Sequence, residues 1–453
     1  MVLTEEMSRA FQLIEETTTH LYITGKAGTG KTTFLKYLVE NTHKNLVVTA
    51  STGIAAVNAG GVTLHSLFGI PLGIQDANVT MRGRLSLEKI ELFKALDVLV
   101  IDEISMVRPD IIDYLDRKLR LYKMVDIPFG GMQIVMFGDL YQLPPVVKGD
   151  EKNALLQLYR GVFFFYAHIW RKCSFQVIEL TKVFRQSEQR FVEILNNIRN
   201  YRMTQRDIND LDRLRDRRAS KDYDNQHIHI CAYKRDVQRI NSEMLGEATH
   251  SFKAQISGDF PASAAPCDEL LELRVGARVM TLINDNKEHL YCNGSMGIVD
   301  EIKKNAIVVL LDSGDSVEIT PFEWVATEYT VQDKEIVAKE KGKCRQFPLT
   351  LAWAITIHKS QEEQIVQFEN AIEILASQGL TFDKVTIHTK GAFCPGQLYV
   401  ALSRCTSMDG IISESYIDKR YIIPEHELIA FEQAYQKANG IFNKDTYHSM
   451  TLR

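Results

Sequence analysis

Short, almost continuous runs of apolar residues alternate with amphipathic stretches along the first part of the chain. The apolar runs lie at 20–24, 45–50, 97–102 and 133–138. A run of this kind is typical of a strand that is buried on both faces of a parallel sheet. Helical spacing of apolar positions occurs at 32–40 and at 109–122, and Pro109 opens the second of these helices. This order predicts a doubly wound α/β domain over residues 1–183.

A second α/β set follows, and a segment of different character interrupts it. Strand patterns lie at 227–232, 351–357 and 384–389, and helical patterns lie at 234–246 and 395–406. Between them, short alternating runs lie at 277–283, 297–302, 306–311 and 316–320. Short runs separated by turn residues are typical of antiparallel strands. We therefore expect a second α/β domain from 184–270 and 346–453, with a small β-barrel inserted at 271–345 and a linker at 252–268.

Composition says more about the partners that the protein can bind than about its fold. The chain has 453 residues, with 45% hydrophobic and 25% charged residues, which suits two large globular domains. Its formal net charge of −5 means that any contact with nucleic acid needs a local basic groove. The seven cysteines form no C-x-x-C pair, so neither a zinc site nor a redox motif is indicated. Because we find no signal peptide and no apolar run of membrane-spanning length, we expect a cytoplasmic protein from a bacterium or phage.

The segment GKAGTGKT at 25–32 matches the phosphate-binding pattern G-x-x-x-x-G-K-[ST]. It follows a predicted strand and precedes a predicted helix, which is the context that this pattern requires. Its glycines let backbone N–H groups surround phosphate oxygens, and the helix adds its positive N-terminus. Lys31 can reach the β- and γ-phosphates, and Thr32 can ligate Mg²⁺. The predicted nucleotide-binding residues are Gly25, Ala27, Gly28, Thr29, Gly30, Lys31, Thr32 and Thr33.

Two acids end the predicted strand in the segment VLVIDE at 98–103. Two acids at the tip of an apolar strand are costly unless they have a function there, and a phosphate loop in the same sheet makes such a function the better explanation. Asp102 would hold Mg²⁺, directly or through water. Glu103 would orient and deprotonate the water that attacks the nucleotide.

Three further polar residues are candidates for a role beside the nucleotide. Gln142 follows the fourth strand and can sense the γ-phosphate or position water. A turn stabilised by Pro144 and Pro145 would explain the same segment equally well. Arg185 and Arg404 lie at the edges of the second domain, from which an arginine finger could reach the phosphates. Most arginines are instead solvated surface charges, and spacing alone does not distinguish the two roles.

Taken together, these segments resemble the Pif-one (petite integration frequency) family of superfamily one helicases over most of the chain. The matching motifs follow the order of the family: TASTGIAAVNAGGVTLHSLFGI at 49–70, LVIDEISMV at 99–107, GDLYQLPPV at 138–146, LTKVFRQ at 180–186, LAWAITIHKSQ at 351–361 and GAFCPGQLYVALSRCTS at 391–407. The segment 113–140 is similar to the signature that separates this family from its RecD-like relatives.

The resemblance implies a motor of two RecA-like domains, with ATP in the cleft between them and single-stranded DNA across the top of both. Members of the family move 5′ to 3′ and unwind duplexes, forks, RNA–DNA hybrids and G-quadruplexes, and we expect a monomer, or a dimer on DNA. Roles in DNA repair, recombination and telomere maintenance go with this family. A wedge near 66–92 and a Src-homology-three-like barrel near 271–345 are also implied.

The resemblance assigns Glu103, Gln142, Arg185 and Arg404 to catalysis, with Thr32 and Asp102 on the metal. Residues in segments that resemble the DNA-facing motifs are Thr52, His65, Thr356, His358 and Lys359. For either histidine alone, a packing or capping role would explain the residue as well as a DNA contact.

Two features depart from the pattern of the family. Met7 stands where the family has a glutamine that reads adenine, so base recognition is expected to be relaxed or to use backbone groups. In addition, the segment 362–378 separates two parts of one motif, and its apolar residues recur with helical spacing. We expect an extra amphipathic helix there, which leaves open whether Gln361 or Gln378 faces the nucleotide. The alternative function is a single-stranded-DNA-binding ATPase in which this helix weakens or uncouples unwinding.

Overall fold

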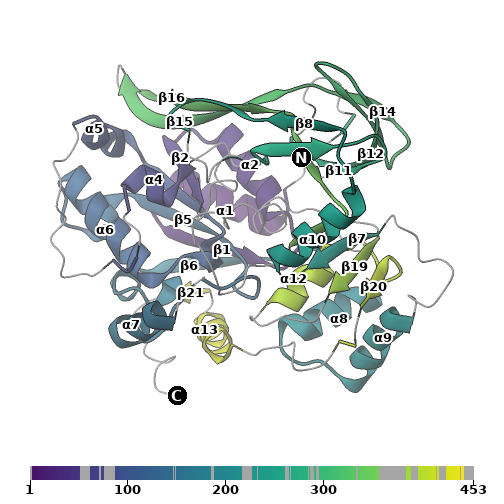
Figure 1. The fold of residues 1–453 in the computed structure, drawn as a ribbon. Helices are drawn as coiled ribbons and strands as arrows, with labels where there is room; N and C mark the ends of the chain where they lie inside the picture. The colour runs from purple at the N-terminus through teal and green to yellow at the C-terminus, as the bar shows by residue number, and fades with distance from the viewer. Residues whose placement is uncertain are drawn as a thin grey trace.

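Two parallel sheets and a group of antiparallel strands make up the described part of the chain (Figure 1). The structure is a computed structural model, and it describes residues 3–50, 62–70, 73–75, 87–145, 147, 149–184, 188–216, 227–231, 233–260, 265, 267–283, 285, 290–291, 295–332, 335–356, 384–388, 396–414, 416–417, 425–438 and 440–442. The predicted helix at 362–378 lies outside these residues.

Seven strands form the first sheet, in the order β21-β6-β1-β5-β4-β2-β3. Their bounds are β1 (His20–Gly25), β2 (Leu46–Ala50), β3 (Val62–Thr63), β4 (Val98–Asp102), β5 (Gln133–Gly138), β6 (Phe175–Leu180) and β21 (Ile441–Phe442). All pairings are parallel except that of β21 with β6. The four strands predicted here are present as β1, β2, β4 and β5, which confirms the doubly wound α/β class. The pattern does not predict β6, because Gln176 and Glu179 interrupt its apolar residues.

Alternate residues of the central strands face two separate hydrophobic cores. On β5, Ile134 and Met136 belong to one core, whereas Val135 and Phe137 belong to the other. The helices of this first unit are α1 (Glu5–Glu16), α2 (Lys31–Asn41), α4 (Leu64–Phe68), α5 (Leu87–Ala95), α6 (Pro109–Lys123) and α7 (Gly149–Tyr159). α1 and α2 contribute to the core of Val135, and α6 contributes to the core of Met136. Burial on both faces is what a parallel sheet requires.

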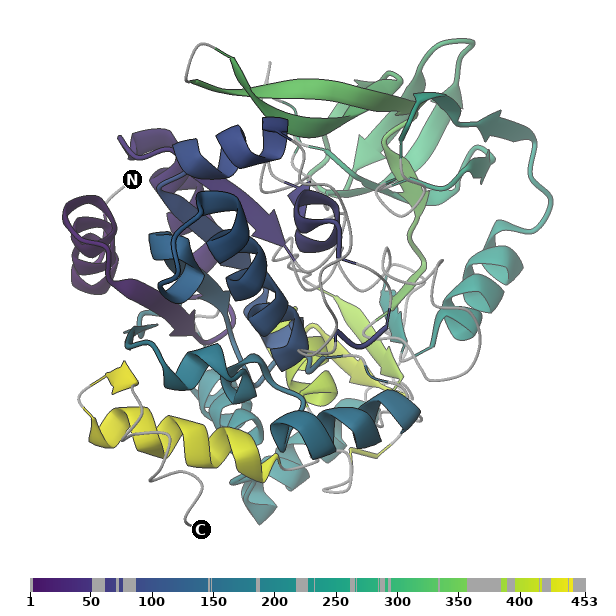
Figure 2. The same cartoon turned by 90° about the vertical axis from the view of Figure 1, so that its left-hand side faces the viewer.

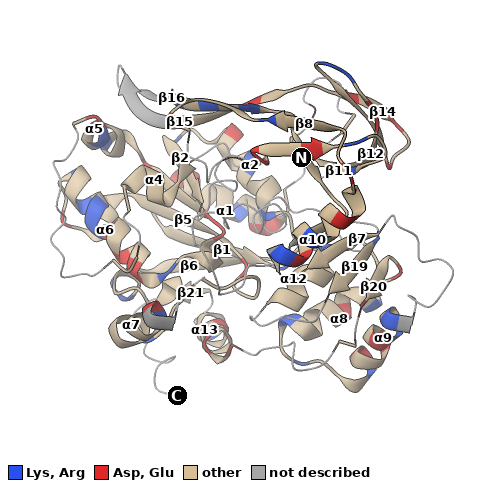
Figure 3. Cartoon of the chain, viewed as in Figure 1, with Lys and Arg blue, Asp and Glu red and all other residues tan. Residues whose placement is uncertain are grey.

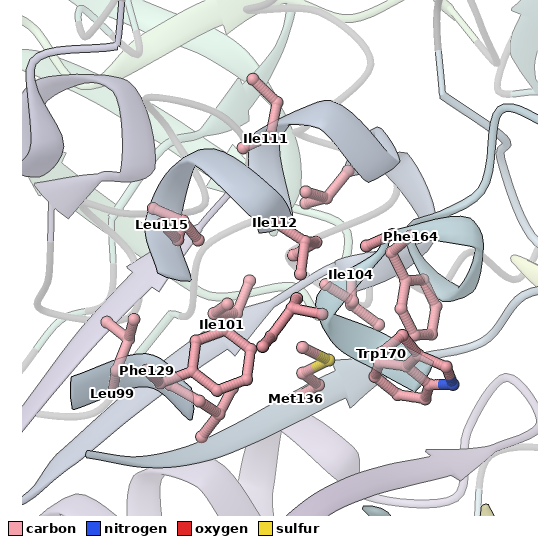
Figure 4. Packing of buried hydrophobic residues seen from close by; sticks show 14 of the residues in the cluster. Leu99, Ile101, Ile104, Ile111, Ile112, Leu115, Phe129, Met136, Phe164 and Trp170 are labelled. Atoms are coloured by element: carbon pink, nitrogen blue, oxygen red, sulfur yellow. The ribbon is translucent and has the colours of Figure 1, made fainter. Parts of the chain in front are cut away.

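Aromatic residues fill the core between α6 and the sheet (Figure 4). Trp170 is fully buried, and its ring stacks on Phe175 of β6 with centroids 3.7 Å apart. Phe164 meets Trp170 edge to face at 5.0 Å. In Figure 4 the rings of Phe164 and Trp170 lie beside Met136 of β5 and below Ile112 of α6. Burial of so many aromatic rings stabilises the packing of α6 on the first sheet.

The C-terminal elements differ from the expected division of the chain, which assigned 346–453 to the second domain. α13 (His426–Lys437) packs on the first core, where Phe431 stacks on Phe165 with centroids 4.4 Å apart. β21 then adds to the edge of the first sheet by pairing with β6. α13 lies near α7 in Figure 1, and Figure 2 shows that one end of α13 faces one end of α7. The expectation fails because α13 has an ordinary amphipathic pattern, which does not say which core it covers.

A second unit is built on a four-stranded parallel sheet with the order β18-β7-β19-β20. Its elements are β7 (Ile228–Cys231), β18 (Ala354–Thr356), β19 (Val385–His388), β20 (Ile411–Ser413), α8 (Gln189–Arg199), α9 (Gln205–Asp216), α10 (Lys234–Leu245) and α12 (Gln397–Ser403). The strand predicted at 351–357 is divided between two sheets. Its first residue ends β17 (Leu349–Leu351) in the antiparallel group, and β18 follows after Trp353.

The segment that interrupts the second unit forms antiparallel sheets, as its alternating pattern predicts, but these strands extend beyond the expected bounds of 271–345. Its elements are β8 (His250–Lys253), β9 (Gln255–Gly258), β10 (Leu270–Leu273), β11 (Arg278–Thr281), β12 (Met296–Ile302), β13 (Ile307–Leu311), β14 (Ser316–Ile319), β15 (Phe322–Gln332) and β16 (Glu335–Gln346). β11 to β14 match the four predicted runs and form a five-stranded sheet with β17. The expected linker at 252–268 is wrong in part, since β8 and β9 lie there. The long β15–β16 hairpin extends over the first unit and contacts α5 (Figure 1).

Among the helices that the structure describes, none combines the length and the apolar character needed to cross a membrane.

We predict that Phe431→Ala lowers the free energy of unfolding by about 3–5 kcal/mol, because it removes a buried ring from the first core. Urea denaturation followed by circular dichroism would measure the change. Val39→Ala on α2 is the control, since Val39 is 43% exposed and should change stability by less than about 0.5 kcal/mol. Equal stabilities of the two variants would show that α13 does not belong to this core.

Candidate nucleotide-binding and catalytic site

The loop between β1 and α2 has the backbone of a phosphate-binding loop. Gly28 and Gly30 have φ angles of 78° and 84°, a region that residues with a Cβ rarely adopt. At Gly25 a Cβ would come within 2.6 Å of Thr29 Oγ1 and 2.7 Å of the Leu180 carbonyl oxygen. The glycines of the motif are therefore required by the turn itself. Gly30 caps α2, and Lys31 is the first residue of that helix.

Lys31 lies at the N-terminal end of α2, where Thr32 and Thr33 follow in the first turn. Its Nζ donates to the carbonyl oxygens of Gly25 at 2.6 Å and Lys26 at 3.1 Å. Burial lowers the pKa of Lys31, and the carboxylates of Asp139, Glu103 and Asp102 oppose that shift. The ammonium group is thus enclosed by protein and faces a group of acids.

The predicted acids lie at the tip of β4, beside this lysine. Asp102 ends the strand, and its Oδ1 accepts a hydrogen bond from the Glu103 N–H at 2.9 Å. Burial raises the pKa of Asp102 to about 6. Burial together with the charge of Asp102 raises the pKa of Glu103 to about 8. Glu103 has a φ of 50°, so a left-handed turn directs the chain away from the strand at this position.

The turn that carries Gln142 touches the second unit. Gln142 is buried, and its N–H donates to the Asp139 carbonyl oxygen at 2.9 Å. A Cβ on Gly396, which caps α12, would collide with the Gln142 carbonyl oxygen. Close approach of α12 therefore depends on a glycine. Leu143 also belongs to the hydrophobic core of the second unit, so the two units share a packed contact here.

α12 brings two residues to the phosphate loop. The Ala27 N–H donates to the Tyr399 hydroxyl oxygen at 2.9 Å, and Tyr399 is buried. Arg404 follows the helix and is 2% exposed. Its charge opposes the rise in the pKa of Glu103 that burial and Asp102 cause. Tyr399 is absent from the predicted site, although it lies inside the matched segment YVALSR, where a buried polar residue beside a predicted finger could have indicated it.

For the other predicted residues the structure gives only a position, or does not describe them. His65 is exposed on the short helix α4, and Thr356 ends β18. Met7, expected beside the base, is 1% exposed, and its Cε lies 3.1 Å from where a Cβ on Gly30 would be. Predicted residues that lie outside the described part of the chain are Thr52, Arg185, His358, Lys359, Gln361 and Gln378.

Comparison with known proteins identifies the family. A model of the PIF1-like helicase family matches residues 2–209. The crystal structure of Bacteroides sp. Pif1 in complex with ADP-AlF4 is 50% identical and has a TM-score of 0.89, covering 98% of this chain and 99% of that one. This chain belongs to the PIF1-like helicase family. The family establishes the α/β fold class with RecA-like phosphate-loop units.

Two other relatives define the extent of the likeness to Pif1 proteins. The structure of Bacteroides Pif1 bound to single-stranded DNA is also 50% identical and covers 98% of this chain and 99% of that one, with a TM-score of 0.70. The human ATP-dependent DNA helicase PIF1 is 32% identical over 411 residues, which are 86% of this chain and 57% of the human protein. The chain thus spans less than two thirds of that relative.

We predict that the raised pKa of Glu103 makes stability fall with pH. The folded protein holds a proton on Glu103 up to about pH 8, whereas the unfolded chain releases it near 4.5. Because the folded state binds more protons across this window, its free energy of unfolding decreases as the pH rises from 4.5 to 8. Urea denaturation at pH 5, 6.5 and 8 without nucleotide should show a smaller decrease for Glu103→Gln. Identical pH profiles of wild type and variant would contradict the shift.

Proposed function

We propose that this protein is an ATP-dependent 5′-to-3′ DNA helicase and translocase. The observation that supports the proposal best is the contact of both units at one phosphate loop, where Tyr399 meets Ala27 and Gly396 meets Gln142. A nucleotide bound at such a junction can couple hydrolysis to relative movement of the units. The likeness to Bacteroides Pif1, which covers nearly all of the chain, supports the same function.

The proposed chemistry follows from the groups at the loop. Lys31 binds the β- and γ-phosphates, Glu103 accepts a proton from the attacking water, and Gln142 positions that water. Arg404 stabilises the charge that develops on the phosphates, and Arg185 is proposed to assist it. These assignments give each motif a separate task in one hydrolysis step.

Mg²⁺ is proposed as the metal cofactor. The hydroxyl of Thr32 and the carboxylate of Asp102 are hard oxygen donors, which this ion prefers, and they would hold it. The raised pKa of Asp102 fits such a role, because a nearby divalent charge would favour the ionised carboxylate. When bound, Mg²⁺ neutralises charge on the phosphates.

Single-stranded DNA is the proposed track, with duplexes, forks, RNA–DNA hybrids and G-quadruplexes as structures to unwind. Lys and Arg are interspersed with acids over the described elements, and β16 is an example (Figure 3). On β16, Lys341 pairs with Asp259, and Lys343 pairs with Glu323. Binding would depend on local phosphate contacts and base stacking, and would weaken as salt rises. The expected residues Thr52, His65, Thr356, His358 and Lys359 remain proposals for these contacts.

The proposed motor domains are residues 1–183 and the two segments 184–249 and 352–417, and the antiparallel strands from β8 to β17 form the proposed inserted barrel in place of the expected 271–345. α13 and β21 are better assigned to the first domain. The wedge near 66–92 is proposed from family resemblance, and its described parts include α4 and α5.

The alternative function is a single-stranded-DNA-binding ATPase that unwinds weakly. It is favoured by the insertion at 362–378, which divides a motif that links the nucleotide site to DNA in the family. The acidic face of an amphipathic helix would repel DNA phosphates if it lay over the DNA groove.

We predict that single-stranded DNA stimulates ATP hydrolysis by about tenfold or more, because DNA favours closure of the two units. Lys31→Ala should lower the stimulated rate by at least about 100-fold, since it removes a cation from the phosphates. A coupled phosphate-release assay would measure both. Lys36→Ala, at an exposed position of α2, is the matched control. Intact DNA binding without stimulation would contradict an active motor.

We predict little change in fork unwinding when residues 362–378 are replaced by a flexible Gly/Ser linker of the same length, if the protein is an efficient helicase. A rise of about tenfold or more would favour the alternative, because the native helix would then be the element that uncouples hydrolysis. A strand-separation assay with a 5′ overhang measures the rate. The same assay with a 3′ overhang checks the direction of movement.

A further inference from the structure

One buried cation near the phosphate loop has no role in the proposed chemistry. Arg199 is the last residue of α8 and is 5% exposed. α8 packs against α12, the helix that carries Tyr399. A buried arginine is rare unless it is paired, so its partners indicate what it does.

The partner of Arg199 belongs to the first unit. Its Nη2 lies 3.1 Å from Asp139 Oδ1, and both side chains are buried. The guanidinium also lies over the ring of Tyr141, 4.1 Å from the centroid. The Tyr141 hydroxyl in turn donates to Glu432 of α13. Burial opposes the charge of Arg199, but Asp139, Tyr399 and Glu432 outweigh it and raise the pKa above its usual value.

Asp139 organises the turn that carries Gln142. Its Oδ1 accepts from the Tyr141 N–H at 3.2 Å, and its carbonyl oxygen accepts from the Gln142 N–H at 2.9 Å. Its Oδ2 is buried and has no hydrogen-bond partner among the described residues. Asp139 therefore carries a charge whose one strong partner here is Arg199.

Asp139 also lies close to Lys31. β1 and β5 are adjacent, with Thr24 opposite Gly138, so the next residues along the two strands, Gly25 and Asp139, are neighbours at the same edge of the sheet. Lys31 Nζ donates to the Gly25 carbonyl oxygen. Asp139 is the acid that acts most strongly on the pKa of Lys31, and Arg199 acts on it in the opposite sense. One buried carboxylate thus faces two cations, one from each unit.

We propose that Arg199 is a positioning residue for ATP hydrolysis, which neutralises Asp139 so that Lys31 stays available to the phosphates and the Gln142 turn stays in place. The inference rests on the proposed ATP-dependent function and extends it to a residue outside the matched motifs. Arg199 also links the charge at the phosphate loop to α8, so movement of the second unit changes the partner of Asp139.

Loss of Arg199 and loss of the charge of Asp139 should have opposite effects on nucleotide binding. Without Arg199, Asp139 is a buried, uncompensated carboxylate, and Lys31 becomes its partner. Phosphate must then compete with Asp139 for the lysine. Without the charge of Asp139, two cations remain near the phosphates, and Lys31 loses the carboxylate that acts on it most strongly. If the ion pair only stabilised the fold, substitution of either residue would weaken nucleotide binding.

The experiment compares Arg199→Gln, Asp139→Asn and the double variant with wild type. Fluorescence titration with a slowly hydrolysed ATP analogue gives Kd, steady-state hydrolysis with DNA gives KM and kcat, and thermal unfolding gives Tm. Arg199→Gln should raise Kd and KM about tenfold or more, whereas Asp139→Asn should not raise them. The double variant should return Kd to within about threefold of wild type, with kcat still reduced because the Gln142 turn is loosened.

Arg199→Lys is the conservative variant and should keep Kd near the wild-type value, because it preserves the charge. Arg239→Gln is the matched control, since it breaks an exposed ion pair with Glu243 on α10. An unchanged Kd in folded Arg199→Gln, or a double variant that binds as weakly as Arg199→Gln, would overturn the proposal. If wild type itself fails to bind the analogue, the proposed function fails instead.

Discussion

The close approach of α12 to the Gln142 turn is the constraint on which the rest of the site depends. Gly396 permits it, because any Cβ there would collide with the Gln142 carbonyl oxygen. This contact lets Tyr399 reach the Ala27 N–H, and Arg404, which follows the same helix, acts electrostatically on Glu103 of the β4 tip. The hydrophobic core of the second unit even includes Ala27 from the phosphate loop. Movement of α12 therefore alters the nucleotide site directly, without any intermediate element.

Local patterns predict the first sheet and its phosphate loop, whereas contacts between distant segments are not predictable from them. The glycines at 28 and 30 and the acids at 102 and 103 are recognisable because each follows a strand within one short motif. Arg199 carries no such signal, because its role depends on which helix meets which loop, and Tyr399 is marked only by its place inside the matched segment 391–407. The same limit explains α13, whose apolar face suits either core, and β6, whose two polar residues conceal an otherwise buried strand.

The chain passes between the two units twice. It leaves the first unit after β6, builds the second unit and the barrel, and returns to the first core through α13. Glu432 on the returning helix bonds to Tyr141, and Tyr141 lies against Arg199 from the second unit. A double connection of this kind restrains how far the two units can separate.

The charged groups at the phosphate loop do not fully stabilise one another's ionised forms. Such an arrangement suits a site that binds a charged ligand. Burial raises the pKa of Asp102 and Glu103 and lowers that of Lys31, so every group is pushed towards its neutral form. A nucleotide with a divalent cation supplies what each group lacks, since the cation favours ionised carboxylates and the phosphates favour the ammonium. Binding would therefore release protons from the acids and ready Glu103 to act as a base. Because Arg199 already neutralises Asp139, the remaining unbalanced charges are those that face the ligand.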